Sequence, residues 1–220
     1  MTSVAHYIAR VGSAAPVVTL SAGFGAGGSV IGPRVAERLG VPFLDRAIPA
    51  EVSKQLAVPL EEALARDERS PHGVGRVLAA FAHVSLGVGW APPPNPLDEQ
   101  AYKAEAEKVI EARAAGGAVI LGRAAALVIG ERPGALHVRL HGPPAARAAQ
   151  AIRIGAAEAA DAERTLLDAD RSRDAYVKKL YGVDPADPRH YHLVIDSTAL
   201  PLDECVQLIA HAATAAQRAA

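Results

Sequence analysis

A glycine-rich segment near the start of the chain has the residue types and spacing best suited to chemistry. Residues 17–22 are Val-Val-Thr-Leu-Ser-Ala, residues 23–29 are Gly-Phe-Gly-Ala-Gly-Gly-Ser, and an amphipathic segment follows. A buried strand, a glycine-rich turn and a helix in this order are typical of a loop that binds phosphate. Glycines let successive backbone N–H groups turn inward, and a helix N-terminus attracts an anion. We therefore expect residues 23–29, which we call the phosphate loop, to hold phosphate groups.

The phosphate loop departs from the usual pattern G-x-x-x-x-G-K-[ST] at two positions. Ala22 stands in place of the first glycine, and Gly28 stands in place of the lysine. The missing ammonium group would contact the β- and γ-phosphates, and a hydrogen bond to a charged group contributes roughly 1.5–3 kcal/mol. Phosphoryl transfer here would need positive charge from elsewhere in the chain. The candidate nucleotide-binding residues are Gly23, Gly25, Ala26, Gly27, Gly28 and Ser29, with the Ser29 hydroxyl placed to reach a Mg²⁺ ion that accompanies ATP. The alternative is an ordinary glycine-rich turn between a strand and a helix.

Five short apolar runs predict the strands that must position this loop. They lie at residues 17–21, 41–45, 118–121, 136–140 and 192–196. Helical segments are expected at 29–39, 97–115, 124–129, from Pro144 onward, 157–181 and 201–218. Alternation of this kind predicts an α/β fold with a five-stranded parallel sheet between two layers of helices. In such sheets ligands bind at the carboxyl ends of the strands, where the phosphate loop, Asp45, Arg123 and Asp196 fall.

The whole chain is expected to form a single domain of 220 residues with one insertion. Prolines interrupt the helical character of residues 47–96, so we predict an inserted helical lobe at approximately 46–97. Arg147 and Arg153 lie on one predicted helix and would face either a cleft or solvent. The alanine-rich end, residues 210–220, is expected to fray.

Composition excludes several classes of protein. With 23 basic and 24 acidic residues the formal net charge is -1, which argues against a general nucleic-acid binder. The single cysteine, Cys205, lies in an apolar run where burial is expected, and it excludes an internal disulfide. No signal peptide and no membrane-spanning run is evident, so we expect a cytoplasmic protein. His190 and His192 bracket a tyrosine, and packing is favoured over metal binding there.

Five segments taken together resemble the cytidylate kinase-like branch of the nucleoside monophosphate kinases. They are residues 21–28, 39–46 (Leu-Gly-Val-Pro-Phe-Leu-Asp-Arg), 119–123 (Val-Ile-Leu-Gly-Arg), 170–176 and 192–198 (His-Leu-Val-Ile-Asp-Ser-Thr). They occur in the order of that family and cover approximately residues 16–212, with the weakest match at 50–100. The resemblance implies a P-loop kinase core, a lobe for the nucleoside monophosphate and an arginine-bearing lid at approximately 155–185.

The resemblance also assigns roles to individual residues. Asp45 and Arg46 would face the acceptor nucleotide, and Arg123 would meet its phosphate or ribose. Arg171 and Arg173 would belong to the lid together with Asp170, a further candidate for substrate binding. Arg123, Arg171 and Arg173 are the candidate catalytic residues, because an arginine brought to the transferred phosphoryl group can accelerate transfer by on the order of 10³ to 10⁵.

The phosphate loop of this branch often reads G-x-G-G, so the resemblance implies that the missing lysine is a feature of the branch. Two departures from the cytidylate kinases themselves bear on function. Gly28 replaces the lysine, and Ala124 replaces the aspartate that follows Gly-Arg in cytidylate kinases. The leading hypothesis is an ATP- and Mg²⁺-dependent kinase of a nucleoside monophosphate, with CMP as the first candidate. One alternative is a nucleotide-binding module with little or no transferase activity. Another is a kinase of a different small metabolite, as in the shikimate or gluconate kinases. We expect nucleotide substrates as its partners and no binding to nucleic acid or membranes. We expect the protein to be a monomer or a homodimer.

Overall fold

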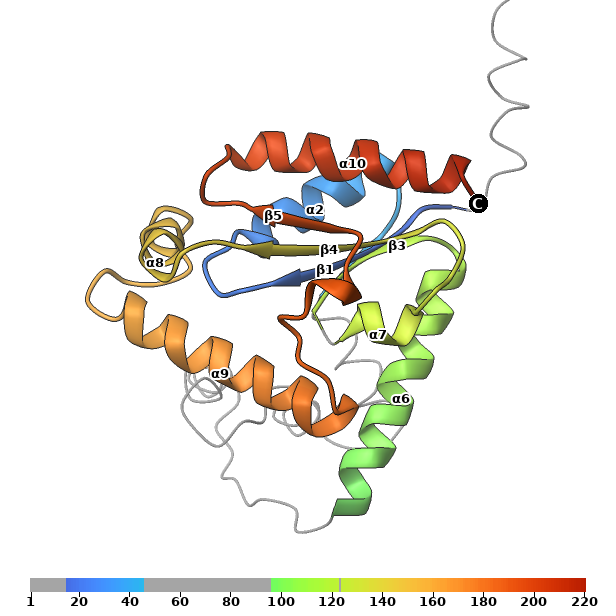
Figure 1. Cartoon of the computed structure of the whole chain (residues 1–220), viewed down its shortest axis with the longest axis horizontal. Coiled ribbons are helices and arrows are strands. Elements are labelled where there is room, and N and C mark those ends of the chain that lie inside the picture. The colour runs from blue at the N-terminus through green and yellow to red at the C-terminus, as the bar shows by residue number, and fades with distance from the viewer. Residues whose placement is uncertain (1–14, 46–95, 123) are drawn as a thin grey trace, which may run out of the picture.

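Five parallel strands form one sheet in the order β2-β3-β1-β4-β5 (Figure 1). The structure is a computed structural model that describes residues 15–45, 96–122 and 124–220. The strands are β1 (Val17–Ala22), β2 (Phe43–Leu44), β3 (Ala118–Leu121), β4 (Ala135–His141) and β5 (Leu193–Asp196). The predicted α/β fold with a five-stranded parallel sheet is confirmed. The central strand β1 leads directly into the phosphate loop, so the loop begins at the carboxyl edge of the sheet, between the ends of β3 and β4.

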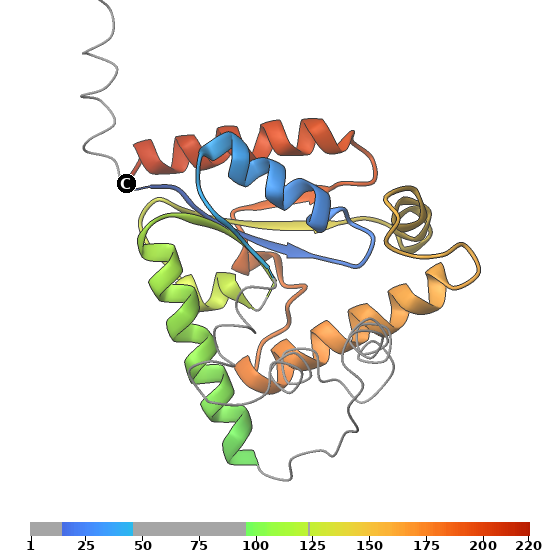
Figure 2. The same ribbon diagram turned by 180° about the vertical axis from the view of Figure 1, so that it is seen from behind.

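Helices cover both faces of the sheet (Figures 1 and 2). On one face lie α2 (Gly28–Leu39) and α10 (Leu202–Arg218), and on the other lie α6 (Pro96–Ala115) and α7 (Ala125–Ile129). Two further helices, α8 (Pro144–Arg153) and α9 (Ala162–Tyr181), pack together through a small apolar cluster near the loop. The short 3-10 helix η1 (Pro188–His190) precedes β5. Among the described helices, none has the length and hydropathy needed to cross a lipid bilayer.

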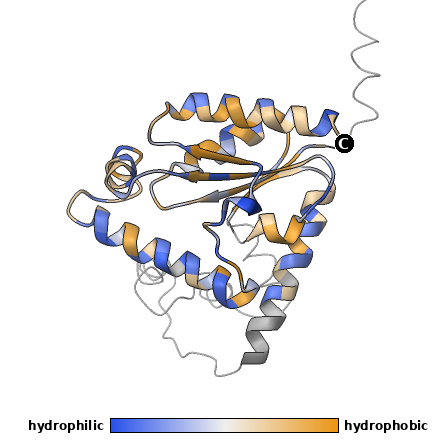
Figure 3. Ribbon diagram, in the orientation of Figure 1, coloured by the Kyte–Doolittle hydropathy of each residue, from blue (hydrophilic) through white to orange (hydrophobic). Residues whose placement is uncertain are grey.

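The core consists of aliphatic side chains that the parallel strands bury on both faces. Val18, Leu20 and Val138 pack with Ile31 and Ile209 on the α2/α10 side. The smaller cluster on the other side holds Ile120 and Ile110, among others, against α6 and α7. Figure 3 shows apolar residues concentrated on the strands, whereas α9 is largely hydrophilic. Because α9 offers little apolar surface, polar contacts have more weight in fixing its position.

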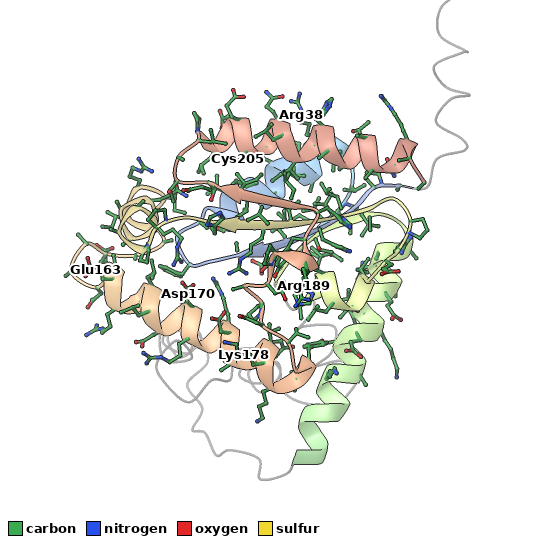
Figure 4. The ribbon with its side chains drawn as sticks, in the orientation of Figure 1. Arg38, Glu163, Asp170, Lys178, Arg189 and Cys205 are labelled. Atoms are coloured by element: carbon green, nitrogen blue, oxygen red, sulfur yellow. The ribbon has the colours of Figure 1, made fainter. Side chains whose placement is uncertain are left out.

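Most predicted element boundaries agree with the structure to within one residue, and two differ by more. The strand expected at 41–45 is reduced to Phe43–Leu44, since it pairs only with β3 at the edge of the sheet. The helix expected from residue 157 begins at Ala162. The prediction that residues 210–220 fray is wrong, because α10 continues to Arg218 and buries Ala210 and Ala213 against the core. Cys205 is fully buried on α10, as predicted (Figure 4).

The predicted inserted lobe at 46–97 lies outside the described residues, apart from its last two residues. These belong to α6, which begins at Pro96. Proline is well tolerated in the first turn of a helix, where its missing N–H would have no partner.

Candidate active site

The phosphate loop turns through two glycines that hold left-handed backbone conformations. Gly25 has φ 75°, and Gly27, the N-cap of α2, has φ 78°. Residues with a Cβ atom rarely adopt these φ angles, so the path of the backbone requires glycine at both positions. The loop closes on itself through a hydrogen bond from the Ala26 N–H to the Gly23 carbonyl, 3.0 Å. The Gly27 carbonyl accepts the first N–H groups of the helix, from Val30 and Ile31.

Four backbone N–H groups of the phosphate loop have no acceptor among the described residues. The amides of Gly25, Gly27, Gly28 and Ser29 donate no hydrogen bond to any residue in the described ranges. Gly25, Gly27 and Gly28 are buried, whereas Ser29 is exposed. Buried N–H groups without partners cost free energy, and a helix N-terminus carries a partial positive charge. Such a row of donors can bind a multiply charged anion, which is what the sequence predicts for this loop.

Side chains from other elements hold the carbonyl groups of the loop and that of Ala22, the last residue of β1. Arg147 Nη1 donates to the Phe24 carbonyl, 2.9 Å, and Gln150 Nε2 donates to the Gly25 carbonyl, 3.0 Å. Ser197 Oγ donates to the Ala26 carbonyl, 2.7 Å, and Arg173 Nη1 donates to the Ala22 carbonyl, 3.1 Å. With its carbonyls fixed from α8, α9 and the end of β5, the loop presents its amides to the other side.

Arg147 is the central residue of this arrangement. Its Nε donates to the Gly142 carbonyl, 2.9 Å, and its Nη1 also donates to Asp170 Oδ2, 2.7 Å. The Arg147 side chain is only 10% exposed. The other carboxylate oxygen of Asp170 accepts the N–H of Phe24, 2.8 Å. Asp170 lies on α9 (Figure 4), so this pair connects the helix to both the loop and α8.

A pocket of about 370 Å³ lies next to the phosphate loop. Its walls come from the end of α8 (Gln150, Arg153 and Ile154) and from residues 198–202, Thr-Ala-Leu-Pro-Leu, which connect β5 to α10. Gln150 contributes to this pocket and also holds the Gly25 carbonyl, so the pocket and the loop share a wall. Within the described ranges no group of three or more His, Cys, Asp or Glu side chains is arranged to hold a metal ion.

Two aspartates, one on α9 and one at the end of β5, have shifted pKa values. Burial raises the pKa of Asp174, and the neighbouring carboxylates Asp170 and Asp184 add to this, while Lys178 and Arg139 oppose it. Hydrogen bonds from the Thr198 side chain and backbone lower the pKa of Asp196. Asp196 thus fixes the turn that leads into the pocket wall.

The structure brings the predicted loop residues together but separates the predicted arginines. Arg173 contacts the start of the loop, whereas Arg171 is exposed and makes no hydrogen bond or ion pair with another described residue. Asp170 lies against the phosphate loop. Asp45 is half-buried at the end of β2, which β3 separates from β1. Arg46 and Arg123 lie outside the described residues, so their roles stay predictions.

Sequence reasoning did not assign Gln150 or Ser197 to the loop, and it left Arg147 between a cleft and solvent. The only available signal for Ser197 was its place in the segment 192–198, which resembles the family without indicating a role. Nothing in the local pattern of α8 distinguishes Arg147, which is buried, from Arg153, which lines the pocket.

Comparison with known protein families gives a match over most of the chain. The model of the cytidylate kinase-like family matches residues 17–199. This range begins with β1 and ends in the pocket wall after β5, so it contains the phosphate loop and every residue that holds it.

Individual relatives are more distant. A curated protein, the uronate isomerase of Corynebacterium glutamicum, is 35% identical over 94 residues, which is 42% of this chain. The match spans only 18% of the length of that protein. A solved structure of an uncharacterised protein from Eubacterium ventriosum has a TM-score of 0.64 and 15% identity, with 90% of this chain and 98% of that chain covered. A gluconokinase from Sinorhizobium meliloti has a TM-score of 0.49 and 18% identity, with 94% and 95% covered. At these identities the likeness to the Eubacterium protein concerns the fold alone.

Proposed function

Since the chain belongs to the cytidylate kinase-like family, we propose that it transfers a phosphoryl group from ATP to a nucleoside monophosphate, with CMP as the first candidate acceptor. The observation that carries the proposal is the row of loop amides, from Gly25 to Ser29, that lack protein acceptors at the N-terminus of α2. A site of this kind suits the phosphates of a nucleotide.

The residues around the loop fit ATP and Mg²⁺. The exposed Ser29 hydroxyl has no partner among the described residues, which leaves it available to a metal ion carried by the phosphates. The pocket beside Gln150 has a volume suited to a nucleoside, since small-ligand sites usually occupy about 300–1,000 Å³. When bound, ATP with Mg²⁺ supplies the activated phosphoryl group and two positive charges beside it.

The protein's own contribution is positioning and charge. The loop amides hold the phosphates in one place, and Arg147, Gln150 and Ser197 keep those amides oriented before the ligand arrives. Donors that are already oriented need no rearrangement during the reaction, so their stabilisation of developing charge is larger. Arg173 on α9 brings positive charge to the carbonyl of Ala22, the residue that leads into the loop, whereas Gly28 carries no charge.

The acceptor side rests on the residues predicted from the resemblance. Asp45 follows β2, and the path from β2 to the loop crosses β3, whose end leads to Gly122 and Arg123. We propose that Asp45, Arg46 and Arg123 hold the acceptor there, facing the phosphates of ATP.

A nucleotide-binding module with little transferase activity is the second candidate. Two observations favour it: no cationic side chain is present at position 28, and Ala124 stands where an aspartate is expected. A kinase of another small metabolite is a further possibility, because no described residue identifies the base or sugar of the acceptor.

An assay that couples ADP release to a spectroscopic signal tests the proposal. ATP with Mg²⁺ is supplied with each nucleoside monophosphate in turn, and then with shikimate and gluconate. Arg123→Ala is the test variant. Arg38→Ala is the matched control, because Arg38 is exposed in the last turn of α2, at the end away from the loop (Figure 4).

We expect ADP release that requires CMP, is lost in Arg123→Ala and is retained in Arg38→Ala. If ADP is released only with a different acceptor, that acceptor takes the place of CMP in the proposal. ATP binding by calorimetry without release for any acceptor favours the binding module. Failure to bind ATP with Mg²⁺ at millimolar concentration overturns the proposal.

A further inference from the structure

Position 28 has no room for a side chain. A Cβ atom placed on Gly28 would lie 2.7 Å from the Cβ of Ala22 and 3.0 Å from Cδ1 of Leu121. Carbon atoms at 2.7 Å overlap, and the Cβ of Ala22 cannot rotate away because it is attached directly to the backbone of β1. The backbone of Gly28 itself does not require glycine, since its φ is not positive.

This packing relates the two departures from the usual loop pattern to each other. The usual pattern has glycine at the position of Ala22 and lysine at the position of Gly28. In this chain residue 22 has a Cβ atom and residue 28 has none. The Cβ of Ala22 on β1 therefore occupies the space that a Cβ of residue 28 on α2 would need. Lysine at position 28 is therefore excluded for as long as Ala22 is present.

A positive charge reaches Ala22 from α9. Arg173 Nη1 donates to the carbonyl of Ala22 itself, 3.1 Å, from a helix that is 151 residues further along the chain. The guanidinium group thus lies at the start of the loop, beside the residue whose methyl group takes the place of a side chain at 28. Arg173 is exposed, so it can also reach a ligand on the loop.

We infer that Ala22 and Gly28 are a matched pair, in which the methyl group of Ala22 replaces the side chain at position 28, and that Arg173 supplies the phosphate-binding charge that a loop lysine would supply. The first half concerns packing alone. The second half rests on the proposed function.

A double-mutant cycle in thermal unfolding tests the packing half. The proteins are wild type, Ala22→Gly, Gly28→Ala and the double variant. Gly116→Ala is the matched control, because a Cβ there would meet nothing within 4 Å and its φ is not positive. Overpacking a rigid site costs roughly 1–3 kcal/mol, so we expect Gly28→Ala to lower the melting temperature by about 5 °C.

In the double variant at least half of that loss should be recovered, because removing the Ala22 methyl opens the space. Gly116→Ala should melt within about 1 °C of wild type. The packing half is overturned if Gly28→Ala melts as wild type does. It is also overturned if the loss of melting temperature in the double variant equals the sum of the losses in Ala22→Gly and Gly28→Ala. If Gly28→Ala does not fold at all, a double variant that also does not fold overturns it.

A rescue experiment tests the charge half. Arg173→Ala should reduce phosphoryl transfer at least tenfold, measured as kcat and KM for ATP. Gly28→Lys combined with Ala22→Gly should then restore part of the lost turnover in the Arg173→Ala background. Gly28→Lys with Ala22 retained should not, because the lysine has no space. A residue that merely supports the loop would not be replaced by a charge at position 28.

The charge half is overturned if Arg173→Ala turns over as wild type, or if lysine at position 28 restores activity equally with Ala22 and with Gly at position 22. If the wild-type protein neither turns over nor binds ATP, the proposed function and the charge half both fail. The melting cycle still decides the packing half in that case, so the two failures are distinguishable.

Discussion

Two polar networks lie in different parts of the molecule, and they use their hydrogen bonds differently. At the carboxyl edge, Arg147 and Asp170 bind the backbone of the phosphate loop. Toward the amino ends of the strands, His137 on β4 is bonded through Nδ1 to the Thr19 hydroxyl on β1, 2.8 Å, and through Nε2 to the Gly130 carbonyl, 2.8 Å. The His137 ring also stacks on His192, with centroids 4.8 Å apart.

The second network is closed on itself. A carbonyl oxygen can only accept, so His137 Nε2 carries the hydrogen and Nδ1 accepts from Thr19. Both ring nitrogens are therefore used within the protein. In the first network the side chains donate hydrogen bonds to the loop carbonyls. The amides of Gly25 and of residues 27–29 have no acceptor among the described residues. A buried polar side chain therefore indicates a binding site when it orients backbone N–H groups outward. It indicates only a contribution to stability when all of its hydrogen bonds are made within the protein core.

The largest effect is expected for Arg147→Ala. Removing this side chain takes the donor from Asp170 Oδ2 and from the Phe24 carbonyl and leaves a partly buried carboxylate without its counter-charge, which we expect to cost about 2–4 kcal/mol of unfolding free energy. Binding of ATP, measured by calorimetry, should weaken at least about tenfold, because the loop loses its support.

The control for this variant is Arg34→Ala, which removes an exposed ion pair between Arg34 on α2 and Asp203 on α10. Exposed pairs contribute about 0–1 kcal/mol, so this change should have little effect on unfolding and none on ATP binding. Equal losses in the two variants would contradict the special position of Arg147.

A smaller effect is expected for Asp170→Asn. The amide oxygen can still accept the Phe24 N–H, but the amide NH₂ group would face the Arg147 guanidinium, a donor against a donor. We expect a loss of about 1–2 kcal/mol in urea unfolding, with ATP affinity reduced less than in Arg147→Ala. A rise in ATP affinity would instead show that the carboxylate competes with phosphate for the Phe24 N–H.

The closed network predicts stability changes without binding changes. Thr19→Val removes the donor to His137 Nδ1 at nearly constant volume, which should cost about 1 kcal/mol and leave ATP affinity unchanged. If Thr19→Val weakens ATP binding as strongly as Arg147→Ala does, the two networks are not functionally separate.

The same network predicts how stability depends on pH. Burial lowers the pKa of His137, with the nearby His192 acting in the same direction. The native state then favours the neutral ring, so this contribution is complete above the ordinary value of about 6.5 and is lost as the pH falls. We expect the unfolding free energy to decrease from pH 8 to pH 5.5, by at most about 1.4 kcal/mol per pH unit from this residue. The decrease should be smaller in His137→Leu and unchanged in His190→Gln.

The smallest effect is expected for Arg189→Ala. Arg189 forms a two-point ion pair with Asp187 on the surface, and these hydrogen bonds lower the pKa of Asp187 to about 2. Because solvent screens this pair and its arginine is exposed, the melting temperature near neutral pH should not change measurably. A clear loss would show that charge pairs contribute to stability regardless of burial, and would weaken the comparison between the two networks.

Local patterns in the sequence determined the fold class and the position of the phosphate loop. Continuous apolar runs such as residues 118–121 predict buried parallel strands, and the glycines of residues 23–28 predict a loop whose backbone N–H groups turn inward. Parallel strands place their carboxyl ends together, so the loop, Asp45 and Asp196 were expected at one edge. These inferences succeed because each depends on neighbours within a few residues.

Only the tertiary structure decided which side chains hold the loop. The donors to its carbonyls come from residues 123 to 171 positions away, namely Arg147, Gln150, Ser197 and Arg173. Their helices show no local difference between a buried arginine and an exposed one. The sequence also does not reveal that a Cβ at residue 28 would overlap with Ala22. In the sequence, Ala22 and Gly28 are two unrelated departures from the phosphate-loop motif. Packing relates them, because the distance between atoms across a turn is set by the folded backbone and not by the order of the residues.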